Sequence, residues 1–267
     1  MRATMPLPKY HQIYLILREQ LQEGRFDLGV PGEHVLAGQF NVARITIRKA
    51  MEMLVADGLV SRRPGRGTHP VHPSTSAPTP KSHPAPPRHQ KANLTGLLEN
   101  IVNMGLRTSV RVLESAVVSA TPQVSEALRL ASRSEVLKAI RVRSTDDGPL
   151  SFITTYVPAS LATFDHAELQ HKPLLMLLEE AGVELGAATQ SISAKLADAV
   201  VARELDVAVG SALLSVTRVV FDTLERPVQL LQGLYRPDRY QYQLQLSRIG
   251  SIDARVWVSE ELSAQFH

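Results

Sequence analysis

The stretch from residue 31 to residue 68, PGEHVLAGQFNVARITIRKAMEMLVADGLVSRRPGRGT, decides the fold of the N-terminal part of this chain. Apolar residues at helical spacing predict two short helices, residues 33–40 and 44–57, and Asn41 suits the left-handed backbone of a tight turn between them. Gly58 is a natural end for the second helix. A strand from Leu59 then leads into RRPGRGT, whose glycines permit a hairpin tip. The pattern predicts a winged helix-turn-helix.

A further helix over residues 9–23 is expected to complete this unit, because its apolar residues recur at three- and four-residue spacing: Tyr10, Ile13, Tyr14, Leu17 and Leu21. The predicted helix 44–57 has a buried face made of Ile47, Ala50, Met51 and Leu54. Its other side presents Arg44, Thr46, Arg48 and Lys49.

That polar side favours double-stranded DNA. The N-terminal turn of a recognition helix enters the major groove, where an arginine can bond two acceptors of guanine. The hairpin residues Arg63, Gly65, Arg66 and Gly67 can approach phosphates or a minor groove. Residues 1–92 hold 13 Lys/Arg and 6 Asp/Glu, against 16 and 20 in the remainder. We therefore expect a polyanionic partner at the N-terminal part only.

Residues 7–68 resemble the DNA-binding domain of GntR-type bacterial transcription regulators. The matching motifs are KYHQI (9–13), VPGEHVLA (30–37), VARITIRKA (42–50) and the hairpin RPGRGT (63–68). The resemblance implies that the DNA contacts come from Glu33, His34, Arg44, Thr46, Arg48, Lys49, Arg63, Gly65, Arg66 and Gly67. Gly32 and Ala43 stand where the family has serines, and His34 where it has an arginine. These departures affect the expected operator sequence and affinity, and leave the expected fold unchanged.

Residues 70–91 contain seven prolines in 22 residues and no apolar periodicity. Such a segment cannot form a helix interior or a sheet, and is typical of an extended spacer. We therefore expect a DNA-binding domain over 1–69, a linker over 70–91, a second domain over 92–248 and a C-terminal extension over 249–267.

The second domain has a mixed pattern, which predicts an α+β fold on an antiparallel sheet. The expected strands cover residues 110–118, 136–144, 150–157, 192–196, 212–222 and 228–235, with 240–246 continuing the last hairpin and 256–258 as an edge strand. The expected helices cover 94–104, 125–130, 174–181 and 198–205.

The order of these pieces resembles the UTRA effector domain of the HutC-like branch of the same regulators, which is chorismate-lyase-like in fold. The matching motifs are IRVR (140–143), GPL (148–150), TYVP (155–158), PLL (173–175) and YRPDRY (235–240). The resemblance implies dimerisation through the sheet and a pocket for a small molecule. The implied effector-binding residues are Thr108, Ser109, Arg141, Arg143, Thr155, Tyr156, Gln229, Tyr235 and Arg236.

Arg141 and Arg143 are expected to hold an anionic group of the effector, because guanidinium forks bind carboxylate and phosphate well. Members that bind amino-sugar phosphates carry a Glu where this chain has Ile153, which favours an anionic ligand with a less polar body. Alternatively, the two arginines are exposed strand residues that pair with Asp146 or Asp147, and Asp238 and Arg239 pair across a turn.

Several classes of chemistry find no support. The chain has no cysteine, so disulfides and thiolate metal sites are excluded. Its histidines are scattered, no nucleotide-binding or hydrolase motif stands in context, and no cofactor or metal is predicted. We see no signal peptide and no apolar run long enough to span a membrane, so a cytoplasmic location is expected.

Together these features predict a transcription regulator that is not an enzyme. We expect a repressor that acts as a homodimer on a palindromic operator and responds to a small anionic metabolite. Two other interpretations stay open: the second domain is an enzyme acting on a small organic acid, or the protein is a constitutive DNA binder.

Overall fold

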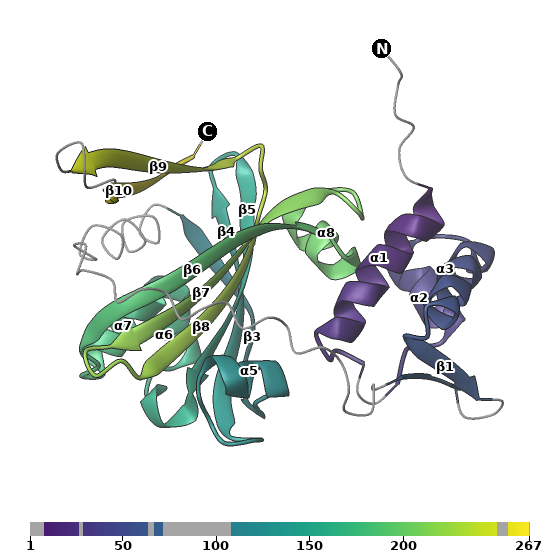
Figure 1. Ribbon diagram of the computed structural model, residues 1–267, viewed down its shortest axis with the longest axis horizontal. Helices are drawn as coiled ribbons and strands as arrows, with labels where there is room; N and C mark the ends of the chain where they lie inside the picture. Colours follow the sequence, from purple (N-terminus) through teal and green to yellow (C-terminus); the bar gives the residue numbers. More distant parts are fainter. Residues whose placement is uncertain (1–7, 27–28, 64–66, 72–107, 250–255, 267) are drawn as a thin grey trace, which may run out of the picture. The chain divides into compact units, whose positions relative to one another are not determined.

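The structure, a computed structural model, describes residues 8–26, 29–63, 67–71, 108–249 and 256–266 (Figure 1). The chain divides into two compact units: Met1–Ala85 with Leu196–Ala212, and Pro86–Lys195 with Leu213–His267. The predicted helix 94–104 and nearly all of the predicted linker lie outside the described residues.

The first unit contains a winged helix-turn-helix, as the sequence predicts. Its elements are α1 (Lys9–Gln22), α2 (Glu33–Phe40), α3 (Arg44–Ala56) and the antiparallel pair β1 (Val60–Arg63) and β2 (Gly67–Pro70). Asn41 ends α2 with a φ of 49°, the left-handed conformation expected at this turn. Helix α8 (Ala199–Leu205), which follows the buried N-cap Asp198, also belongs to this unit.

Apolar side chains of the three N-terminal helices meet in one core. Leu17, Leu36, Ile47 and Leu54 are each at most 1% exposed, and the full core also includes Ile13, Tyr14, Ile16, Phe40, Ala50 and Met51. Burial of each large apolar side chain contributes about 1.5–3 kcal/mol. This core sets the rotation of α3, so the side of α3 opposite Ile47 and Leu54 faces water.

The second unit is built on a six-stranded antiparallel sheet with the strand order β3-β4-β5-β8-β7-β6. The strands are β3 (Ser109–Ser119), β4 (Glu135–Thr145), β5 (Gly148–Pro158), β6 (Leu185–Leu196), β7 (Ala212–Asp222) and β8 (Pro227–Tyr235). Register places Arg141 opposite Ile153, which in turn lies opposite Gly233 and then Val216. Residues in such a row point to the same face of the sheet.

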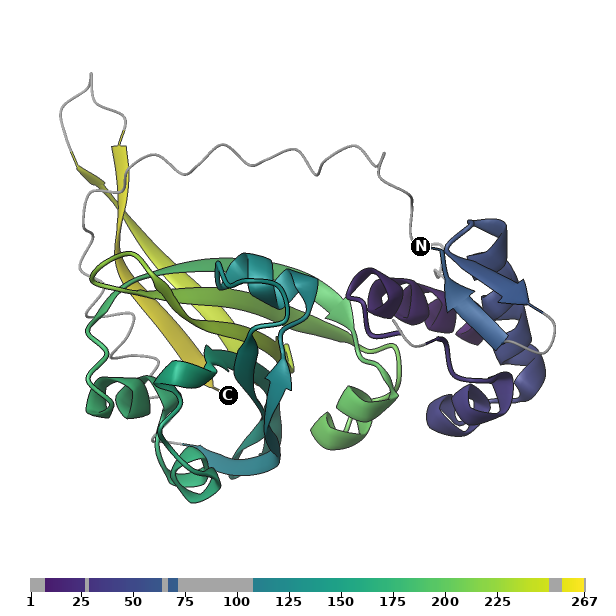
Figure 2. The same ribbon diagram turned by 90° about the horizontal axis from the view of Figure 1, so that it is seen from below.

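Helices cover both faces of this sheet (Figure 2). Helices α6 (His166–His171) and α7 (Leu174–Glu180) pack on the face that carries Leu137, Ala139 and Val157. Helix α5 (Pro122–Ala127) packs on the opposite face, against Val136 and Leu230. A short 3₁₀ turn, η1 (Ala159–Leu161), follows β5.

The C-terminal strands differ from the prediction. Strand β9 (Tyr240–Ile249) does not continue the β7–β8 hairpin; it pairs with β10 (Val256–Phe266) in a separate two-stranded sheet. The expected edge strand 256–258 is the beginning of β10. Helix α5 starts earlier than expected because Thr121 caps it and Pro122 occupies its first position.

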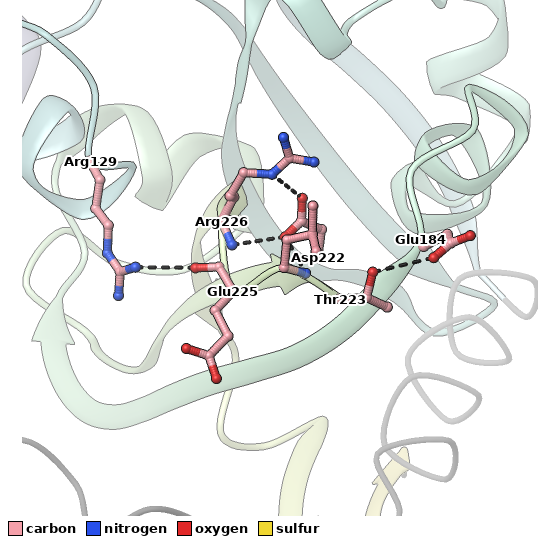
Figure 3. Close-up of polar contacts among 7 residues, drawn as sticks. Arg129, Glu184, Asp222, Thr223, Glu225 and Arg226 are labelled. Carbon is pink, nitrogen blue, oxygen red and sulfur yellow. Dashed lines mark hydrogen bonds and ion pairs between the residues drawn. The ribbon is translucent and has the colours of Figure 1, made fainter.

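The β7–β8 turn is held by one carboxylate (Figure 3). Asp222 accepts hydrogen bonds from the backbone N–H groups of Leu224 and Arg226 and from the Arg226 side chain, at 3.0, 2.8 and 2.6 Å. Glu225 at the tip has a φ of 59°, and its carbonyl accepts from Arg129. Burial raises the pKa of the Asp222 carboxyl, but these donors together lower it below its usual value.

Candidate DNA interface and ligand cavity

The water-facing side of α3 brings together most of the residues predicted to contact DNA. Arg44, Ile45, Arg48 and Lys49 are exposed, and Thr46 is half-buried. All of them lie in the first two turns of the helix. A helix that presents arginines on its N-terminal turns has the form needed to enter a major groove.

Glu33 organises two of the arginines. One of its carboxylate oxygens lies 2.9 Å from Nη2 of Arg62 on the wing, and the other lies 3.5 Å from Nε of Arg48 on α3. A carboxylate in this place would repel a phosphate, but it can hold two guanidinium groups side by side. The structure thus shows the Glu33 carboxylate in contact with both arginines.

The remaining predicted DNA contacts are distributed over the unit. His34 is exposed on α2, and Nζ of Lys49 lies 4.0 Å from the ring centroid of Tyr10. Gly67 begins β2 with a φ of +83°, which favours glycine. Gly65, Arg66 and the side chain of Arg63 lie outside the described residues.

Both helix N-termini at this surface lack a side-chain cap. The N-cap residues are Gly32 for α2 and Ala43 for α3, and neither donates or accepts a capping hydrogen bond through a side chain. The first N–H groups of a helix are unsatisfied unless a cap, water or ligand meets them. At the start of α3 the Thr46 N–H donates to the Ala43 carbonyl at 2.9 Å, and a phosphate would meet the N–H groups that precede it.

A cavity lies in the second unit, on the sheet face that α7 covers. It is lined by Thr108, Arg141, Arg143, Leu150, Ser151, Ile153, Pro173, Leu174, Leu175, Arg218, Gln229, Leu231 and Tyr235. The described lining combines three arginines with aliphatic side chains, and none of these residues is an Asp, Glu or His.

Arg141 is the most unusual residue of the cavity. It is 2% exposed, and its Nε and Nη1 atoms have no hydrogen-bond partner among the described residues. Burial, and then the charge of Arg143, lowers the pKa of Arg141 to about 9, so the guanidinium stays protonated at neutral pH. A buried cation without a counter-ion costs several kcal/mol. The alternative in which Arg141 is an exposed strand residue is therefore wrong.

Hydroxyl groups lie at the same end of the cavity. Nη1 of Arg143 donates to Oγ1 of Thr108 at 3.0 Å, and burial lowers the pKa of Arg143 as well. The Oγ atom of Ser151 is buried without a partner among the described residues. Ser109 begins β3, and its Oγ donates to the carbonyl of Ser144 at 3.3 Å. It borders a second, more open hollow that shares Thr108 and Arg143 with the cavity.

The other predicted effector contacts separate into two groups. Gln229 and Tyr235 line the cavity, and the Tyr235 ring stacks on Tyr240 at 4.4 Å between centroids. Thr155 points to the same face but is buried and bonded to the carbonyl of Ala139 at 3.3 Å.

Ser109 and Thr155 are not among the residues that line the cavity, and neither are two further predicted contacts. Tyr156 lies on the opposite face, against the α5 core. The Arg236 guanidinium forms an ion pair with Asp238 at 2.7 Å, whereas Arg239 donates to the carbonyl of Pro149. The predicted pair of Asp238 with Arg239 is thus replaced by one with Arg236.

Sequence reasoning missed Arg218 and Ser151. Arg218 is 5% exposed and interrupts a strand whose same-face neighbours are Val216 and Val220. A charged residue in a row of buried aliphatic positions was the available signal. The side-chain oxygen of Gln190, on β6, accepts two hydrogen bonds from the Arg218 guanidinium, one of them from Nε at 2.8 Å.

The first unit, with its exposed arginines on α3, defines a DNA-binding regulator, and the second unit adds a domain with a buried cavity. Residues 9–69 match the family described as bacterial regulatory proteins, gntR family, and residues 103–241 match the UTRA domain. The chain belongs to the GntR family of bacterial regulators that carry a UTRA domain.

Similar proteins span almost the whole chain. It is 25% identical to the HTH-type transcriptional repressor NagR of Bacillus subtilis (strain 168), over 91% of this chain and 97% of NagR. It is 28% identical, over 86% of this chain and 93% of the relative, to an Escherichia coli (strain K12) protein whose name assigns it to repression of a fructoselysine utilization operon. A solved structure, described as the ligand-binding domain of a GntR-family regulator from Bordetella bronchiseptica, is 28% identical with a TM-score of 0.51, over 53% of this chain and 90% of that domain.

Among the described residues, no helix combines the length and the apolar character needed to cross a membrane. The same part of the chain contains no group of three or more His, Cys, Asp or Glu side chains that could hold a metal ion.

Proposed function

We propose that this protein is a homodimeric transcriptional repressor that releases a palindromic operator when a small anionic metabolite binds in the second unit. Arg44, Thr46 and Arg48 read and clamp the major groove, and the wing contacts the flanking backbone. Ile45, 74% exposed beside Arg44, offers an apolar contact to a thymine methyl group. Two such units related by a two-fold axis would meet half-sites about one helical turn apart.

The effector-binding part of this proposal rests on Arg141. Two of its guanidinium nitrogens and the Ser151 hydroxyl are buried, unpartnered among the described residues, and adjacent to one cavity. Buried polar groups in folded proteins are satisfied by a partner. An anion that accepts hydrogen bonds from both groups supplies the missing partner and the missing negative charge.

The residues that line the cavity also favour a sensor over an enzyme. The described cavity residues offer arginine, hydroxyl, amide and aliphatic groups, and none of them carries the carboxylate or imidazole that most often serves as a general base. The charges present can bind and orient an acid, which suits a sensor.

The test uses Arg141→Met, which keeps the side-chain volume and removes the charge. Operator binding is measured by fluorescence anisotropy, with and without each member of a panel of small organic acids and phosphate esters. We expect the variant to bind operator as the wild type does and to lose the response to every acid that releases the wild type. Arg129→Ala, which changes an exposed arginine that follows α5 and donates to the Glu225 carbonyl in the β7–β8 turn, is the matched control and should respond normally. A normal response by Arg141→Met would refute the effector assignment.

Ligand-induced change requires that the ligand bind the two states of the repressor with different affinities. If no acid in the panel alters operator binding while several raise the melting temperature through Arg141, the protein binds an anion but does not transmit the event. That outcome would support the constitutive interpretation.

A further inference from the structure

Arg218 gives the cavity a second cationic end. The residue rows of the sheet place Arg218 opposite Leu231 and then Thr155, and Arg141 opposite Ile153 and then Gly233. Both arginines therefore point to the same face, and three inter-strand steps separate β4 from β7. The row of Arg141 ends at Val216 on β7, two residues from Arg218. With about 4.8 Å per step and an offset of about 7 Å along the strand, their backbones lie about 16 Å apart.

The partner of Arg218 does not neutralise it. Among the described residues, the recorded acceptor of its guanidinium is the neutral side-chain carbonyl of Gln190. Burial lowers the pKa of Arg218, as expected for a cation removed from water. The described cavity lining holds no carboxylate that could compensate either end.

The space between the two ends is apolar. Ile153 and Leu231 are 4% and 8% exposed on the sheet, and Leu174 and Leu175 of α7 line the same cavity. Gly233 contributes no side chain there, and a Cβ at this position would lie 2.6 Å from the Tyr235 ring, so the glycine leaves room for that ring.

We propose that the effector is a two-ended dianion with an aliphatic or otherwise apolar middle. One anionic group is held by Arg141 and Arg143 with the hydroxyls of Thr108 and Ser151, and the second by Arg218. This inference rests on the proposed effector function of the cavity and narrows it to a ligand class. Dicarboxylates and phosphorylated or phosphono-carboxylates belong to that class, whereas neutral sugars and monoacids do not.

The test is a length series measured on the full chain by isothermal titration calorimetry. Succinate, glutarate, adipate and suberate are each compared with the monocarboxylate of equal length, and phosphonopropionate with propylphosphonate. We expect at least one dianion of favourable length to bind about tenfold or more tightly than its monoanion, because a charge-assisted hydrogen bond is worth about 1.5–3 kcal/mol.

Arg218→Gln should reduce the affinity for that dianion to the level of the monoanion and leave the monoanion unchanged. Arg218→Lys, which retains the charge, should keep part of the preference, and operator binding without ligand checks that both variants fold. Equal affinities for dianions and monoanions in the wild type, or a preference that survives Arg218→Gln, would overturn the two-ended ligand.

The proposed function fails separately. It fails if the monoanions and dianions that bind do so as well in Arg141→Met as in the wild type. The two-ended inference alone fails if monoanions bind through Arg141 and a second charge adds nothing.

Discussion

The two units use arginine in opposite environments. On the winged helix-turn-helix, Arg48 and Arg62 are about half exposed and share the carboxylate of Glu33. In the cavity, Arg141 and Arg218 are 2% and 5% exposed, and no carboxylate lies in the described lining. A solvated cation is held at little cost, whereas a buried one costs several kcal/mol until a counter-charge arrives.

This difference indicates which kind of anionic ligand each set of arginines suits. Exposed arginines exchange mobile counter-ions for the phosphates of a large polyanion, and their binding weakens with salt. Buried arginines select a small anion that can leave water and fit the cavity. Under the proposed function, the same side chain would serve an open interface in one unit and a closed, selective site in the other.

The largest expected effect tests whether the two units have separate cores. Leu54→Ala in the first unit and Leu178→Ala in the second each empty a fully buried position, and each should lower the free energy of unfolding of its own unit by about 2–5 kcal/mol. Urea denaturation followed by circular dichroism measures both. Leu224→Ala, at a 69% exposed turn position, should stay within about 0.5 kcal/mol of the wild type. If either substitution lowered the free energy of unfolding of both units equally, the two cores would belong to one cooperative unit.

The next effect tests the open interface. Arg44→Ala should weaken binding to the cognate operator by about 1–3 kcal/mol and relax the base preference at one position in each half-site. Competition binding against a randomised operator library measures both quantities. An equal loss on operator and random DNA would assign Arg44 to phosphate contact and remove its base-reading role.

A smaller effect contrasts the cavity arginines, whose described lining contains no carboxylate, with Arg226, which is bonded to one. Asp222, bonded to Arg226, has a lowered pKa, so its stabilising contribution is present above the unfolded-state pKa and is lost as pH falls through the folded-state pKa, below 3.8. Asp222→Asn should therefore lower the melting temperature at neutral pH, and its difference from the wild type should shrink as pH falls below 3.8. A difference that is constant over this pH range would attribute the effect to the loss of side-chain geometry.

The smallest effect concerns the uncapped recognition helix. Ala43→Ser should supply an N-cap to α3 and stabilise the first unit by about 0.5–1 kcal/mol in thermal denaturation. Ala43→Val, which also lacks a capping oxygen and ranks with alanine at N-cap positions, is the control and should give no gain. No gain with serine would show that solvent already satisfies the first N–H groups of α3.

The winged helix-turn-helix could be predicted closely from sequence because its contacts are local. The periodicity of residues 33–40 defined α2 with the bounds that are observed, and Asn41 and Gly58 marked the ends of α2 and α3. The face Ile47, Ala50, Met51 and Leu54 is buried as predicted.

The second unit was harder to predict from sequence, because its strands pair with partners that are distant along the chain. Strand β6 begins at Leu185, where LGAATQS shows no alternation, and the pairing of β9 with β10 joins residues across the undescribed segment 250–255. Arg218 was missed because it lies outside the family motifs that contain Arg141 and Arg143. Its only sequence signal was its position in β7, where alternate residues face the same side of the sheet. The face on which Tyr156 lies follows from the register of β5 with β4 and could not be read from the TYVP motif alone.

The uncompensated charge of Arg141 also bears on how long the protein survives in the cell. A ligand that binds only the folded state raises the free energy of unfolding by RT ln(1 + [L]/Kd), and here it also removes an electrostatic cost that the empty cavity carries. Proteases attack the unfolded fraction, so under the proposed function the effector would slow the turnover of the repressor that it inactivates. A cell that consumes its effector would then hold fewer copies of the repressor, each again competent to bind its operator.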